Sequence, residues 1–165
     1  MIRLGVALSV LLLWLAPGGQ VDTTVERSRV IAAADRYLKE APVTVTATRA
    51  ARSTGGPHDY FSEGDYWWPD PQNPGGPYVQ RDGQSNPGNF NDHRRALMRL
   101  SVQMPALVAA YTLTNDRKYA VHAARHARAW FMSRNTKMTP ALRYAQAIQG
   151  HVTGHAARGW PRLHH

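Results

Sequence analysis

Residues 64–83 bring large aromatic rings together with helix-breaking residues. Proline lacks a backbone donor and fixes φ, and glycine adds conformational freedom, so this segment is not a regular helix or a central strand; the residues concerned are Pro69, Pro71, Pro74, Gly75, Gly76 and Pro77. We therefore expect the rings of Tyr66, Trp67, Trp68 and Tyr78 to lie on a loop. Burying one tryptophan removes about 150–250 Å² from water, worth about 4–6 kcal/mol. Two neighbouring tryptophans on a loop are hard to bury in their own core, which favours a flat ligand, such as a sugar ring, as the cover.

Hydrogen-bonding side chains accompany these rings, namely Arg81, Asp82, Asn86, Asn89 and Asn91. Sugars present apolar C–H faces and hydroxyl edges, which suit flat rings and bidentate polar groups. Arg81 is able to fork onto a uronate carboxylate. The predicted substrate-binding residues are Tyr66, Trp67, Trp68, Tyr78, Arg81, Asp82 and Asn86. The alternative is that the tryptophans only staple the long loop onto the helices.

Three residues are candidates for proton transfer. His93 stands at the start of a predicted helix, where an imidazole can act as a base or neutralise a carboxylate. Arg143 and Tyr144 are neighbours, and a tyrosine beside a cation gives up its proton more readily. A surface role for His93 and a packing role for Tyr144 are the alternatives, so these residues are weak catalytic candidates.

The sequence favours neither a metal site nor a cofactor. His122 and His126 have the i, i+4 spacing that places two imidazoles on one metal, but Arg125 and Arg128 flank them and no glutamate lies between them. The chain contains no cysteine, which excludes thiolate ligands and disulfides. It also contains no glycine-rich phosphate loop.

Charge is distributed unevenly. The formal net charge is +9, and nine Lys or Arg residues follow Asp116, the last acidic residue. A basic half of this kind favours an anionic partner, which can be a polyuronate, a nucleic acid or a lipid surface. The alternative is a solvated basic face without a partner.

Apolar periodicity predicts three helices, over residues 25–41, 91–114 and 117–132. We expect Asp116 to cap the third, whose predicted inward residues are Tyr119, Ala120, Ala123, Ala124, Ala127, Trp130 and Phe131. The predicted inward residues of the second are Leu97, Leu100, Met104, Leu107, Val108 and Tyr111. Residues 43–48 are predicted to be extended, and residues 140–148 to form a short helical turn. Residues 52–90 are predicted to form one long loop, of which residues 60–90 act as a lid. The fold class is therefore predicted to be all-α.

The two ends of the sequence differ from the rest. Residues 1–20 combine Arg3, an apolar run over residues 4–16 and the breakers Pro17-Gly18-Gly19, as in a secretory signal peptide. The run is shorter than the roughly 20 residues that span a bilayer, so we expect no stable membrane span in the mature chain; a retained anchor is the alternative. Residues 151–165 lack periodicity and suggest a disordered, truncated or frame-shifted tail.

Several blocks resemble the N-terminal part of the alginate lyase family of polysaccharide lyases. They are Ser62-Glu-Gly-Asp-Tyr-Trp-Trp-Pro-Asp-Pro71, Pro77-Tyr-Val-Gln-Arg-Asp-Gly83, Arg117-Lys-Tyr-Ala120 and Tyr144-Ala-Gln-Ala-Ile148. The resemblance covers residues 25–150 and implies a partial α/α toroid of helical hairpins with a long aromatic lid loop. It also implies periplasmic or secreted action, without a metal, on an acidic polysaccharide such as alginate or glucuronan. Such lyases work by β-elimination, in which the C5 proton is removed and the 4-O-linked sugar leaves.

One family feature is missing from the sequence. The central Asn-Asn-His segment that carries the proton chemistry is expected after Ile148 and is not found there, and Asn91-Asp92-His93 stands too early to replace it. The catalytic residues therefore stay unassigned. The sequence predicts an interrupted polysaccharide lyase; the alternative is an exported fragment that binds acidic carbohydrate without cleaving it. Nucleic-acid binding is disfavoured by the export signal and the low lysine content.

Overall fold

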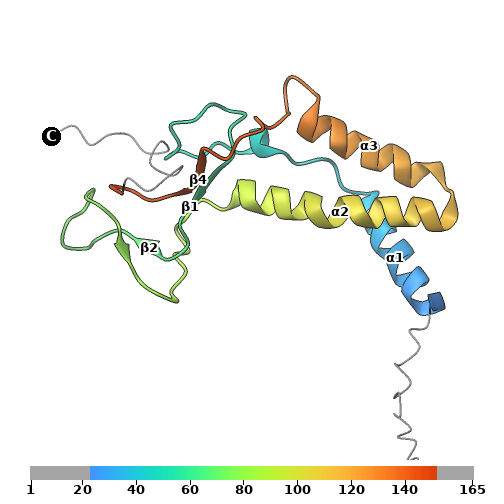
Figure 1. Ribbon diagram of the computed structural model, residues 1–165, viewed down its shortest axis with the longest axis horizontal. Helices are drawn as coiled ribbons and strands as arrows, with labels where there is room; N and C mark the ends of the chain where they lie inside the picture. The colour runs from blue at the N-terminus through green and yellow to red at the C-terminus, as the bar shows by residue number, and fades with distance from the viewer. Residues whose placement is uncertain (1–22, 152–165) are drawn as a thin grey trace, which may run out of the picture.

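The computed structural model describes residues 23–151. The predicted signal peptide lies outside these residues, as does all of the predicted tail except His151. The elements in chain order are α1 (Thr23–Tyr37), the short 3-10 helix η1 (Val45–Ala47), β1 (Phe61–Glu63), β2 (Trp67–Trp68), β3 (Val79–Gln80), α2 (Asp92–Thr114), α3 (Arg117–Phe131) and β4 (Tyr144–Ala147). Figure 1 shows the helices at one end of an elongated molecule and the strands at the other.

Helices α2 and α3 lie side by side and are joined by a two-residue turn (Figure 1). Asn115 adopts a left-handed conformation with φ of 56°, and its N–H donates to the Tyr111 carbonyl at 2.7 Å. The Asp116 carboxylate then accepts from the Lys118 N–H at 3.0 Å, which confirms Asp116 as the cap of α3.

Helix α1 packs across α2 (Figure 1) and contacts α3 through Tyr119. One core cluster joins the three helices through Ala34, Leu107, Ala110, Tyr119 and Ala123. The Tyr119 hydroxyl donates to Asp35 Oδ1 at 2.8 Å, and this bond, together with burial, raises the pKa of Tyr119. Helix α2 has the length and composition of a membrane-crossing helix, and 28% of its apolar stretch is buried in the structure. One such helix is weak evidence for a membrane span, and α2 packs against both α1 and α3.

A second core cluster ties η1 to the other end of α2 and α3 through Val45, Tyr60, Ala96, Leu100 and Trp130. A third core cluster, formed by Ala50, Phe61 and Ala147, includes residues of β1 and β4. The core therefore continues from the helices to the base of the strand region.

The strands form two small sheets. β1 and β4 pair in parallel, with Phe61 opposite Tyr144 and an irregular register before Glu63. β2 and β3 pair antiparallel, with Trp67 opposite Gln80 and Trp68 opposite Val79. We refer to residues 66–81 as the aromatic hairpin; it extends away from the helices at the far end of the molecule (Figure 1).

These sheets correct the predicted fold class. The all-α partial toroid is wrong for this chain, because the structure holds three α-helices together with one parallel and one antiparallel strand pair. Residues 140–148 contain β4 instead of a helical turn, residues 43–48 contain η1 instead of an extended piece, and residues 52–90 contain three strands instead of one loop. The β1–β4 pair joins segments about eighty residues apart, which local periodicity does not reveal.

The three predicted helices are confirmed, with α1 ending four residues earlier than predicted. The predicted inward faces are partly wrong. Phe131, Val108 and Tyr111 are exposed, whereas His122 and His126 are buried. The buried stripe of α3 runs through Tyr119, His122, Ala123, His126 and Trp130, and the next residue, Phe131, turns about 100° away from it at 3.6 residues per turn.

Replacing Trp130 tests this assignment of the α3 face. Trp130 is 1% exposed, whereas its neighbour Phe131 is 60% exposed. Trp130→Ala should lower the free energy of unfolding by about 3–5 kcal/mol, because it leaves a cavity in the second core cluster. Phe131→Ala is the matched control and should change it by about 1 kcal/mol or less. Urea denaturation measures both, and equal losses would contradict the assignment.

Candidate functional site

The aromatic hairpin presents Trp68 together with Arg81. The Arg81 guanidinium lies 4.8 Å from the centre of the Trp68 ring, and the indole Nε1–H donates to the Gln84 carbonyl at 2.9 Å. Both side chains are half-buried. The ring is thus held at its polar edge and covered on one face by a cation, an arrangement worth about 0.5–1 kcal/mol at exposed sites.

Trp67 lies in a different environment. Successive side chains of a strand point to opposite faces, so Trp67 and Trp68 cannot stack on the same sugar ring. The Trp67 ring centre lies 4.4 Å from that of His151, and its indole packs so closely over Gly64 that a Cβ there would come within 2.7 Å. The structure therefore separates the two tryptophans that the sequence analysis placed in one group. Neither is sealed in the core.

The remaining predicted contacts differ in accessibility. Tyr66 is 43% exposed, and Tyr78 is half-buried. Asp82 is exposed in the β-turn that follows β3, where the Gln84 N–H donates to the Arg81 carbonyl at 3.1 Å. These three side chains are placed where a ligand on the hairpin can reach them.

Asn86 has a different position from the other predicted contacts. It is buried, its Nδ2 donates to the Trp67 carbonyl at 2.9 Å, and its Oδ1 accepts from the Gly88 N–H at 2.9 Å. Nearby, Asn89 Nδ2 donates to the Gly64 carbonyl at 2.8 Å. These amides hold the base of the hairpin through backbone groups.

A buried carboxylate, absent from the predicted residues, completes this base. Glu63 is 2% exposed; its Oε1 accepts from Arg52 Nε at 2.7 Å and its Oε2 from the Phe90 N–H at 2.6 Å. The hydrogen bond to Glu63 raises the pKa of Arg52. Arg94 Nη1 donates to Asp65 Oδ1 at 2.6 Å and links α2 to the same region. Glu63 and Asp65 stand within the block 62–71 that carries the family resemblance, which is the one sequence signal that points to them.

His93 is fully engaged with the backbone. It is 4% exposed, its Nδ1 accepts from the Phe61 N–H at 3.0 Å, and its Nε2 lies 2.8 Å from the Thr48 carbonyl. Because an N–H points at Nδ1, that nitrogen carries no proton, and Nε2 donates to Thr48. In this arrangement the imidazole has no nitrogen left for a substrate.

Arg143 and Tyr144 lie at the start of β4. Arg143 is exposed, and Tyr144 is half-buried with its ring against Gly55, where an added Cβ would lie 2.8 Å from Cε2. β4 continues to the hairpin base, where the Gly64 N–H donates to the Ala147 carbonyl at 3.0 Å. Tyr144 therefore belongs to the strand layer beneath the hairpin.

The two histidines of α3 form a buried pair. Their Nε2 atoms lie 3.2 Å apart, and His122 Nε2 lies 3.0 Å from the Glu40 carbonyl. Burial lowers the pKa of His126, and the neighbouring His122 lowers it further. Hydrogen bonding accounts for these contacts, and residues 23–151 contain no cluster of three or more metal-ligating side chains.

The segment after β4 fastens the tip of the hairpin. The Tyr78 N–H donates to the Gln149 carbonyl at 3.0 Å, and Gln149 Nε2 donates to the Gly75 carbonyl at 2.8 Å. His151 Nε2 lies 2.7 Å from the Tyr78 carbonyl. Gly150 has φ of +74°, and a Cβ there would lie 2.6 Å from Pro77 Cα, so the two backbones approach closely only because residue 150 is glycine.

Comparison with known proteins decides the family. The sequence model of the alginate lyase family matches residues 44–160, which is more than half of the chain. This chain belongs to the alginate lyase family. The match confirms the resemblance carried by the aromatic and Tyr-Ala-Gln-Ala-Ile blocks.

A solved structure agrees with the alginate lyase assignment. The crystal structure of an alginate lyase from Bacteroides ovatus matches with a TM-score of 0.66 and 38% sequence identity. The match covers 75% of this chain and 33% of that one, so this member of the alginate lyase family spans about a third of the length of the Bacteroides enzyme. Among the curated proteins, none matches the chain.

The His122–His126 pair predicts a pH dependence of stability. The unfolded chain keeps a His126 pKa near 6.5, whereas the folded value is lower, so the unfolded state binds more protons as the pH falls. The free energy of unfolding should be greatest above about pH 6.5 and should decrease below it. His126→Gln should flatten this dependence. Urea denaturation between about pH 5 and 8 measures it, and an unchanged slope would count against the pair as its source.

Gly150→Ala should loosen the hairpin. The new Cβ collides with the Pro77 backbone, so amide hydrogen exchange at Tyr78 should accelerate about tenfold or more, which corresponds to about 1.4 kcal/mol. Gly75→Ala is the matched control, because Gly75 also has a positive φ, +86°, but its Cβ would meet nothing within 4 Å. Equal acceleration in both variants would show that backbone strain, not docking, is responsible.

Proposed function

We propose that this chain binds a uronate-containing polysaccharide, such as alginate or glucuronan, at the aromatic hairpin, as part of a lyase that cleaves it. Membership of the alginate lyase family supports the substrate class. One observation carries the location: Arg81 lies over Trp68 and, among residues 23–151, has no carboxylate partner. A guanidinium without an acid is free to fork onto a uronate carboxylate, while the indole offers a flat surface to the sugar ring.

The proposed chemistry is β-elimination. Neutralising the uronate carboxylate makes the C5 proton more acidic; a base removes that proton, the C4–C5 double bond forms, and the 4-O-linked sugar leaves with its bonding electrons. Arg81 supplies the neutralising charge in this proposal. Tyr144 is the remaining candidate for the proton transfer, because both nitrogens of His93 are engaged with the backbone. We also propose that the protein acts in the periplasm or outside the cell, where polymeric substrates are found.

The second candidate function is binding without cleavage. The engagement of both His93 nitrogens with backbone groups favours it. The two functions differ in one observable, the formation of the unsaturated product.

Variants of the hairpin test the proposed site. Trp68→Ala and Arg81→Gln should each weaken the binding of alginate tetrasaccharide about tenfold or more, because each removes one half of the ring–cation pair (about 1.4 kcal/mol per tenfold). Arg81→Lys should recover only part of the loss, because lysine lacks the planar fork. Titration calorimetry measures the affinity, and absorbance of the unsaturated product shows whether cleavage follows.

Gln80→Ala is the control for these variants. Gln80 is exposed and pairs with Trp67, so its side chain lies on the hairpin face opposite Trp68. It should bind tetrasaccharide like the unmodified chain. Retention of full affinity by Trp68→Ala and Arg81→Gln would refute the location of the site.

A further inference from the structure

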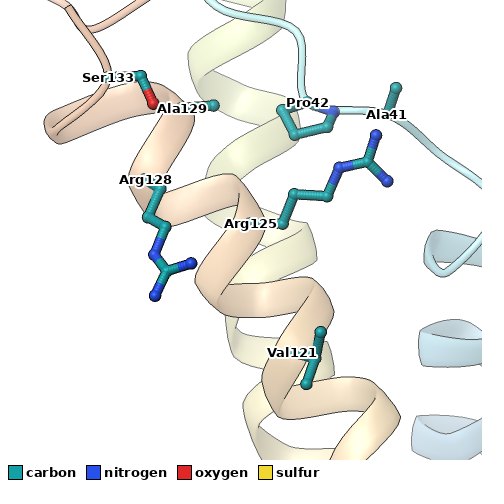
Figure 2. Close-up of a pocket in the computed structure, with 7 residues that line it drawn as sticks. All are labelled: Ala41, Pro42, Val121, Arg125, Arg128, Ala129 and Ser133. Carbon is teal, nitrogen blue, oxygen red and sulfur yellow. The ribbon is translucent and has the colours of Figure 1, made fainter.

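The outer face of α3 carries a hollow that the proposed hairpin site does not use. It lies between α3 and the segment after α1, and has a volume of about 570 Å³. Its lining residues are Ala41, Pro42, Val121, Arg125, Arg128, Ala129 and Ser133. Figure 2 shows that the Arg125 side chain reaches toward Pro42 and Ala41, whereas Arg128 points to the other side of the helix.

A second hollow of about 570 Å³ lies at the carboxyl-terminal end of the same helix. It is lined by His58, Phe131, Arg134, Lys137, Met138, Thr139 and Pro140. Ser133 lines the first hollow and the next residue, Arg134, lines the second, so the end of α3 contributes to both. We call Arg125, Arg128, Arg134 and Lys137 the basic strip.

The charge of the basic strip is not compensated. All four side chains are exposed, and within residues 23–151 none makes an ion pair or a side-chain hydrogen bond. The acidic residue beside the first hollow, Glu40, instead accepts through Oε2 from Arg99 Nε at 2.9 Å and from Gln103 Nε2 at 2.6 Å. No acidic residue follows Asp116 in the sequence.

Apolar and hydroxyl groups lie between these cations. Val121 is 64% exposed and Phe131 60% exposed, and both line the hollows with Pro42 or Pro140. Pyranose rings present C–H faces that pack on such surfaces, and Ser133 and Thr139 offer partners for their hydroxyls. A single-stranded nucleic acid would instead be expected to use several exposed aromatic rings for its bases, whereas the two hollows offer only the phenyl ring of Phe131 and the imidazole of the half-buried His58.

We propose that the basic strip is a second binding site for acidic polysaccharide, separate from the aromatic hairpin. The inference rests on the proposed function for its ligand class, a polymer of uronates. Residues three apart on a helix have Cβ atoms about 5–6 Å apart, yet Arg125 and Arg128 diverge (Figure 2). Diverging cations suit carboxylates spaced along a polymer better than they suit one small anion. A long polymer gains affinity from both sites, whereas a short oligosaccharide fills one.

Binding of short and long alginate to the full chain tests this proposal. Arg125→Gln/Arg128→Gln should weaken the binding of long alginate about tenfold or more and leave tetrasaccharide binding at the hairpin within about twofold. Arg36→Gln/Arg49→Gln is the control, because it removes the same charge from two exposed arginines that line neither hollow. The control should keep the affinity of the unmodified chain for both ligands. Circular dichroism checks that each variant is folded.

The outcomes of these binding measurements distinguish the second site from its alternatives. The inference is overturned if the strip variant binds long alginate normally, if the control loses as much affinity, or if duplex DNA binds more tightly than alginate and depends on the same arginines. Failure of the proposed hairpin site has a different signature, in which Trp68→Ala leaves tetrasaccharide binding intact. Loss of long-polymer affinity confined to the strip variant supports the second site.

Discussion

The buried carboxylate of Glu63 is the contact on which the candidate site depends. It joins Arg52, from the segment before β1, to the N–H of Phe90, which lies two residues before the start of α2. The aromatic hairpin lies between Glu63 and Phe90 in the sequence, so this one group closes the hairpin at its base. Glu63 is 2% exposed whereas Arg52 is 40% exposed, so removing Arg52 would leave a buried carboxylate poorly compensated, at a cost of about 1–3 kcal/mol or more. The contact therefore helps to hold a proline-rich segment that has little regular structure of its own.

The helices and the strands have separate roles. The three helices bury an alanine-rich core, which lets α1, α2 and α3 approach closely and gives a stable base. The hairpin contributes little to that core and extends from it (Figure 1). Its tip is fastened by Gln149 and His151, so residues from both sides of α2 and α3 in the sequence hold the same loop. A binding surface on a loop anchored to a rigid scaffold is a common arrangement in proteins.

The histidines show that residue type and spacing do not by themselves identify a functional residue. His93, His122 and His126 all have spacings or positions that suggest chemistry, and all three are buried among backbone or histidine partners. The basic residues, in contrast, keep the free charge that their residue type suggests. Arg81 and the basic strip carry charges that no acid in the described part of the chain neutralises, and free charge of one sign is what an anionic polymer recognises.

Local sequence determined the three helices, the Asp116 cap and the segment that holds the aromatic residues, because periodicity, capping and proline chemistry act within a few residues. Its blocks also determined the alginate lyase family. Tertiary structure alone decided that residues 144–147 pair with residues 61–63, that Trp67 and Trp68 face opposite ways, and that Asn86 and His93 bind backbone groups. Strand pairing and the hydrogen bonds of buried side chains join residues that are distant along the chain, and no local pattern encodes which partner each one meets.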